Sequence, residues 1–223
     1  MFKLFNLDSP FMRVLTRLTD MVIMSLLWLA CCLPVITIGP STAALYTVAL
    51  KLARKEEIKV TTTFFQGFKK NFKQGVLLNL IFIVVGAVLF FDYLYMSAID
   101  TASGAVASGC FVALGIWFLC IMFYTYPLQA QFKNTIRRTL LNAAILSMRK
   151  IVDTAVVFVL NLLPIITAYA SVKLLSTLEL FVRTIPVWVL LAPGAIAYFC
   201  AQRFVKLFAP YLPPVEEEEP EEE

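Results

Sequence analysis

The sequence contains no histidine and little charge: 15% of its 223 residues are charged, against 60% that are hydrophobic. Without histidine, Ser-His-Asp and Cys-His catalysis, HExxH metal sites and imidazole proton relays are excluded. The five cysteines lie in apolar stretches and form no CxxC pair, which is typical of small buried side chains. GxGxxG and Walker loops are missing as well. We therefore expect a protein that is not an enzyme and that has no metal site and no cofactor.

The sequence contains long hydrophobic stretches instead. Its mean hydropathy is +0.82, whereas soluble domains are about half apolar and about a quarter charged. A membrane-spanning helix needs about 20 mainly apolar residues, and four stretches meet that length: 76–96, 106–128, 152–175 and 185–205. The composition predicts an all-α, polytopic membrane helix bundle with no nucleic-acid partner.

Residues 14–54 are ambiguous, because "CCLPVITIGPST" at 31–42 interrupts a long apolar region with Pro34 and Pro40. The chain crosses here either once or twice. Short cytoplasmic loops are enriched in Lys and Arg, and two crossings place all of these residues except Lys173 and Arg183 on one side. A cleaved secretory signal is the rival, but it would put the basic 51–73 loop outside. The charges favour six transmembrane helices in the plasma membrane, with both termini cytoplasmic and the first two helices forming a Pro-bounded hairpin.

Two segments on the predicted cytoplasmic side are basic and amphipathic. "TTTFFQGFKKNFKQG" at 61–75 places aromatic rings near one helical face and lysines toward the other, which is typical of a helix lying among anionic headgroups at the inner face of the bilayer. The loop at 129–150 has similar helical spacing and could either extend the fourth predicted helix or dock on a cytosolic partner. The cytoplasmic interface residues that we expect are Phe64, Phe65, Phe68, Lys69, Lys70, Phe72, Lys73, Arg137 and Arg138.

The C-terminal end has a different composition from the rest of the chain. The run "EEEEPEEE" carries seven glutamates, and such runs are disordered. We expect a transmembrane helical domain over 1–207 and a disordered acidic tail over 208–223.

Polar groups inside the predicted spans are candidates for function, because they are costly in a bilayer. The candidates are Asn79, Asp92 and Asn161. Interhelical hydrogen bonding would explain the two asparagines, and a place near the outer interface would explain the aspartate.

The turn itself is the other candidate. A helix that begins inside the membrane at Pro40 presents free N–H groups and hydroxyls to an anion or a sugar oxygen. "LPIITA" at 163–168 and "APGAIAYF" at 192–199 resemble "LPVITI" and "GPSTAALY" of the turn. A purely structural turn is the alternative interpretation. The candidate binding residues are Pro34, Thr37, Gly39, Pro40, Ser41 and Thr42.

The stretch "LTDMVIMSLLWLACCLPVITIGPSTAALYTVALKLARKEE", followed by "FFQGFKKNFKQG", resembles the YesL-type family of bacterial membrane proteins, as does "YPLQAQF" with "RRTLLNAAILSMRK". That family has no known function and no known active site. Its members occur mostly in Gram-positive bacteria, often encoded beside carbohydrate uptake and degradation systems. The resemblance implies a non-enzymatic accessory or regulatory component of ABC-type carbohydrate uptake, with transporter or sensor subunits as partners. The alternative is a small solute transporter or channel that uses the turn at 34–42, alone or as a homo-oligomer.

Overall fold

The computed structural model describes residues 10–174 and 178–211, with side chains over 11–166 and 190–211. Every element in this part of the chain is a helix, which confirms the all-α prediction. The elements are α1 (Pro10–Cys31), η2 (Val35–Thr37), α2 (Ile38–Ala53), α3 (Val60–Ser97), α4 (Ala102–Gln131), α5 (Ile136–Arg149), α6 (Ile151–Leu174), α7 (Leu178–Phe208) and η3 (Ala209–Tyr211).

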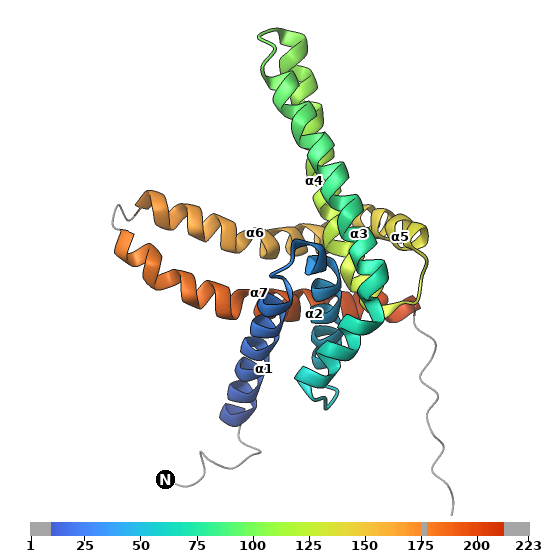
Figure 1. The fold of residues 1–223 in the computed structure, drawn as a ribbon, viewed down its shortest axis with the longest axis vertical. Coiled ribbons are helices and arrows are strands. Elements are labelled where there is room, and N and C mark those ends of the chain that lie inside the picture. The colour runs from blue at the N-terminus through green and yellow to red at the C-terminus, as the bar shows by residue number, and fades with distance from the viewer. Residues whose placement is uncertain (1–9, 175–177, 212–223) are drawn as a thin grey trace, which may run out of the picture.

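Among the residues that the structure describes, four helical segments are long and apolar enough to cross a membrane, as judged by length and composition. They are Phe11–Cys31, Val35–Ala53, Val60–Ser97 and Ala102–Gln131. Helix α2 is the most enclosed of the four, since 61% of its apolar window is buried and it contacts α1, α3, α4 and α7. The α3–α4 and α6–α7 pairs leave this centre in different directions (Figure 1).

The amphipathic segment expected at 61–75 is helical, but it does not form a helix of its own. It is the first part of α3, which runs without a break for 38 residues. The physical reason is local, because no proline lies between Val60 and Ser97 to end the helix. Gly67 and Gly75 lie inside this helix and are buried.

Small residues bring α2 close to its neighbours. Ala43, Ala44 and Ala49 have no exposed surface, and small side chains allow helix axes to approach in membrane bundles. The closest approach is to α3, where a Cβ on Gly75 would lie 2.7 Å from the Pro40 nitrogen. Helix α7 crosses α1 in a similar way, with the Gly194 N–H donating to Ser25 Oγ at 2.8 Å.

The chain end predicted as an acidic tail over 208–223 lies mostly outside the described residues. Phe208 ends α7, and η3 follows at Ala209–Tyr211. Residues 212–223, which include all of the tail glutamates, are not described.

Candidate functional site

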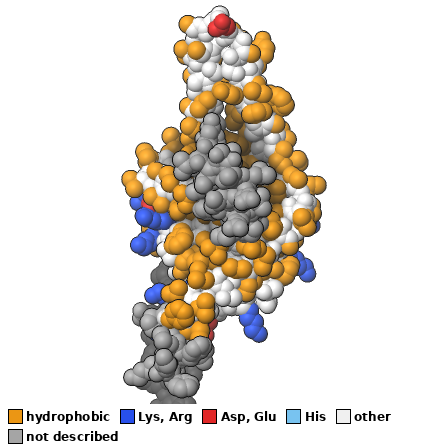
Figure 2. Space-filling view, turned by 90° about the vertical axis from the view of Figure 1, so that its left-hand side faces the viewer, with side chains coloured by type: hydrophobic (Ala, Val, Ile, Leu, Met, Phe, Trp, Pro, Cys, Tyr) orange, Lys and Arg blue, Asp and Glu red, His pale blue; other side chains and the backbone are white. Residues whose placement is uncertain are grey.

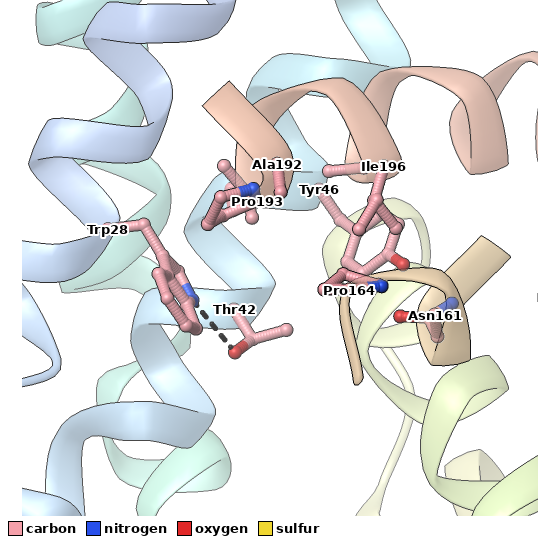
Figure 3. A pocket seen from close by; sticks show the side chains of 10 residues that line it. Trp28, Thr42, Tyr46, Asn161, Pro164, Ala192, Pro193 and Ile196 are labelled. Carbon is pink, nitrogen blue, oxygen red and sulfur yellow. Dashed lines mark hydrogen bonds between the residues drawn. The ribbon is translucent and has the colours of Figure 1, made fainter. Parts of the chain in front are cut away.

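A cavity of about 340 Å³ opens where α1, α2, α6 and α7 meet. This volume lies at the lower end of the range for small-molecule sites, about 300–1,000 Å³. Figure 3 shows the side chains that surround it. The lining residues are Trp28, Thr42, Leu45, Tyr46, Asn161, Pro164, Ala192, Pro193, Ile196 and Ala197.

One polar edge of the cavity is formed by α1 and α2. The Trp28 Nε1–H donates to Thr42 Oγ1 at 3.2 Å (Figure 3). The Thr42 hydroxyl in turn donates to the Ile38 carbonyl at 2.7 Å, one turn earlier in α2. A buried indole N–H needs such a partner, so this pair fixes the indole ring as one wall of the cavity.

The opposite polar edge comes from α2 and α6. The Tyr46 side chain reaches toward Asn161 (Figure 3). The Asn161 Nδ2 donates to the Val157 carbonyl at 2.8 Å and lies 3.7 Å from Cys200 Sγ. These groups offer a donor and an acceptor from side chains that are already held in place.

Two prolines inside long helices contribute to the same cavity, Pro164 from α6 and Pro193 from α7. Proline lacks an N–H, so the Leu160 carbonyl loses its usual helical donor four residues later in α6. In membrane proteins, irregular backbone of this kind is tolerated where it is buried or lines a cavity. The interruption of helical hydrogen bonding at the two prolines is therefore tolerated because both residues line the cavity.

The described lining of this cavity is mostly apolar, with a few neutral polar groups. Among the residues whose side chains are described, none that lines it is Asp, Glu, Lys or Arg, and no group of three or more His, Cys, Asp or Glu side chains could hold a metal ion. Apolar walls with a hydroxyl, an indole, a phenol and an amide suit a small, uncharged, amphipathic ligand.

The structure disperses the candidate binding turn, and of its residues only Thr42 lines the cavity. Pro34 is exposed, and the Thr37 hydroxyl donates to the Cys31 carbonyl at 2.6 Å, which closes the bend on itself. Gly39, Pro40 and Ser41 are buried, and Gly39 and Pro40 pack against Gly75 of α3.

The three candidate intramembrane polar residues lie in three different places. Asn79 is buried in α3, and its Nδ2 donates to the Val35 carbonyl of η2 at 2.9 Å. Asp92 is exposed near the far end of α3. Asn161 lines the cavity. Only Asn161 and Thr42, among the residues proposed from sequence, come together at one site.

The expected cytoplasmic residues divide by burial. Phe64 is fully buried and Phe68 is half-buried, so these two rings belong to the protein core or its edge. The remaining members are exposed on α3 and at the start of α5: Phe65, Lys69, Lys70, Phe72, Lys73, Arg137 and Arg138.

Trp28, Tyr46 and the two prolines were not proposed as site residues from the sequence. The sequence did contain a pattern that could have pointed to the prolines. "LPIITA" and "APGAIAYF" resemble the turn, and they contain Pro164 and Pro193. The structure brings these two segments to the same cavity as Thr42. For Trp28 and Tyr46, the signal was a polar tip on an aromatic ring inside a span, which requires a partner.

Comparisons with known proteins agree with the resemblance seen in the sequence. A family described as "Protein of unknown function, DUF624" matches residues 21–93, which run from the middle of α1 into α3. The "Uncharacterized protein YesL" of Bacillus subtilis (strain 168) is 29% identical over 125 residues, which cover 56% of this chain and 58% of that protein. No solved structure matches the chain.

Proposed function

We propose that this chain, a member of a YesL-type family of unknown function, is a non-enzymatic accessory or regulatory component of the plasma membrane that works with an ABC-type carbohydrate importer. Six crossings with both termini in the cytoplasm are part of this proposal. On the predicted outer side, the connections are short: residues 32–34 with η2 join α1 to α2, and residues 98–101 join α3 to α4.

The distribution of charge supports this orientation. Figure 2 shows Lys and Arg side chains from about mid-height downward on the visible face and none above, whereas hydrophobic side chains are spread over its whole height. Among the described residues, α3 beyond Lys73 and all of α4 contain no Lys or Arg. Basic residues retained on one side are the feature that marks a cytoplasmic face.

The exposed side of α5 is the single observation that carries the proposal. Thr139, Ala143, Leu146 and Ser147 are buried. On the other side, Leu141, Ile145 and Met148 are 52%, 52% and 63% exposed, at spacings of four and three residues that place them on one face. An exposed apolar stripe of this kind marks a surface for a protein partner or for the lipid bilayer, and the proposal assigns it to a protein partner.

The charges beside the stripe and the family resemblance point to the kind of partner. Exposed arginines flank the stripe at both ends of α5: Arg137, Arg138 and Arg149. Because α5 follows α4 on the predicted cytoplasmic side, this surface faces the side on which the ATPase and sensor subunits of an importer act. The association with carbohydrate uptake comes from the YesL-type resemblance, and the surface supplies a place where such a subunit could bind.

The test is purification of the full chain in mild detergent from its native membranes, with identification of the recovered subunits. We expect importer or sensor subunits with the unmodified chain, and about tenfold less of them with the double variant Ile145→Ala and Met148→Ala. Val106→Ala is the matched control, since it removes an apolar side chain that is 69% exposed on α4 and is not one of the expected cytoplasmic interface residues. Recovery of the chain alone, or equal recovery from both variants, would contradict the proposal.

A second candidate, a small solute transporter or channel, is favoured by the cavity. Thr42 and Asn161 reach it from α2 and α6, and both were candidates before the structure placed them together. The reconstituted chain alone would then move a small solute, and Thr42→Val and Asn161→Ala would lower the flux. Ser41→Ala is the control, because Ser41 does not line the cavity. Absence of flux for every solute tried, with correctly folded protein, would exclude this function.

A further inference from the structure

A second pocket, on the predicted cytoplasmic side, differs in chemistry from the cavity described above. It has a volume of about 270 Å³ and lies between the last turn of α2, the first part of α3 and the end of α4. Lys51, Arg54 and Lys70 line it, together with neutral polar side chains, and none of the described residues that line it is Asp or Glu. We propose that this pocket binds a phosphate group.

Arg54 is the best-positioned of the three cations. Its Nη2 donates to Gln131 Oε1 of α4 at 2.7 Å, and this neutral partner holds the guanidinium without neutralising it. Its Nη1 lies 3.8 Å from Glu56 Oε1, in an ion pair whose side chains are 27% and 41% exposed. Exposed pairs of this length contribute little. Guanidinium has five N–H donors, so several remain for a ligand.

A close contact between α2 and α3 forms the floor of the pocket. The Thr47 hydroxyl donates to the Ala43 carbonyl at 2.8 Å and faces Gly67. A Cβ on Gly67 would lie only 3.0 Å from Thr47 Oγ1, so glycine allows the two helices to approach at this level. This approach brings Lys51 and Arg54 of α2 to the same pocket as Lys70 of α3.

The composition of the pocket selects for an oxyanion. Three like charges around one hollow repel one another, and an anion of two charges would relieve that repulsion. The planar fork of arginine matches phosphate oxygens, and lysines add point charges. Lys69 and Lys73 are exposed on α3 outside this lining, so the pocket is distinct from the general basic surface. The phosphate could belong to an anionic phospholipid headgroup or to a free phosphate ester.

The test uses the full-length chain in detergent and measures its thermal stabilisation by inorganic phosphate, beside native mass spectrometry of the lipids that copurify. We expect the double variant Arg54→Gln and Lys70→Gln to lose phosphate binding by about tenfold or more. The double variant Lys59→Gln and Lys206→Gln, which removes the same two charges at exposed positions outside the pocket, should stay within about twofold of the unmodified chain. Arg54→Lys retains the charge but not the fork, and should give an intermediate loss.

The two sources of phosphate give different results. A lipid source predicts that copurifying phosphatidylglycerol is lost in the double variant and that inorganic phosphate fails to displace it. A free ester predicts saturable binding of inorganic phosphate without retained lipid. The proposal would be overturned by a chain that neither retains anionic lipid nor binds phosphate. Equal losses in the control double variant and in the double variant Arg54→Gln and Lys70→Gln would also overturn it. Because Arg54 and Lys70 do not lie on α5, this test is independent of the partner-binding test above.

Discussion

At the residue scale, the contact between α2 and α3 depends on two glycines. A Cβ on Gly39 would collide with the Gly75 carbonyl oxygen, and a Cβ on Gly75 would collide with the Pro40 backbone. Backbone atoms cannot move aside as a flexible side chain can. The bend between α1 and α2 can therefore pack against α3 because Gly39 and Gly75 have no side chain.

We predict that Gly39→Ala destabilises the folded chain by about 1–3 kcal/mol, which is the usual cost of overpacking. The measurement is reversible unfolding in mixed micelles. Gly109→Ala is the control, because nothing lies within 4 Å of a Cβ at that position and alanine is the better helix former by up to about 1 kcal/mol. Equal stabilities for the two variants would show that this close approach does not exist in the membrane.

A second prediction at this scale concerns Asn79. Its amide donates to the Val35 carbonyl of η2, and removal would leave a carbonyl of the bend without that donor. We expect Asn79→Ala to lower the free energy of unfolding by about 1 kcal/mol. Ser97→Ala, which removes an exposed hydroxyl bonded within its own helix at 3.0 Å, should change it much less. An unchanged stability for Asn79→Ala would contradict the proposed attachment of η2 to α3.

At the scale of elements, hydropathy and breakers in the sequence predict the helices well, because both act locally. The apolar stretches at 106–128 and 152–175 correspond closely to α4 and α6, and the break near residues 31–38 follows from its prolines. The length of α3 was not anticipated, since the change from basic to apolar residues near Gly75 resembles a boundary. A change of solvent along a helix does not interrupt its hydrogen bonds, and no proline is present to do so.

The continuity of α3 can be measured with spin labels at positions 69 and 88, both of which are exposed. Nineteen residues of unbroken α-helix span about 28 Å at 1.5 Å per residue. We expect a narrow distance distribution near that value, after allowance for the label arms. A separate interfacial helix, turned away from the span near Gly75, would give a shorter and broader distribution.

The candidate site was harder to predict than the helices, because it depends on contacts between residues far apart in sequence. Thr42 and Asn161 were each identified as polar groups within an apolar region, but their common cavity follows from how α2, α6 and α7 pack. Trp28 and Tyr46 were not identified, since aromatic residues in a span are usually structural. The basic pocket was also missed, although Lys70 was expected at the cytoplasmic face.

At the scale of the whole molecule, the number of crossings depends on α6 and α7. This pair leaves the centre in a different direction from α3 and α4 (Figure 1), so six crossings require both pairs to traverse the bilayer. A single cysteine at position 176, in a chain whose native cysteines are replaced, reports the side directly. We expect labelling by an impermeant reagent from outside intact cells. Labelling only after lysis would mean four crossings, with α6 and α7 on the inner surface.

The proposed cytoplasmic position of α5 and of the basic pocket depends on the predicted reversal of the chain between α1 and α2. The most direct measurement is a pair of reporter fusions, one after Lys59 and one after Asp100, in the connections before α3 and before α4. We predict that the Lys59 fusion is active only as a cytoplasmic reporter and that the Asp100 fusion is active only as an external one. An external reporter signal after Lys59 would contradict the reversal and every role assigned to the cytoplasmic side.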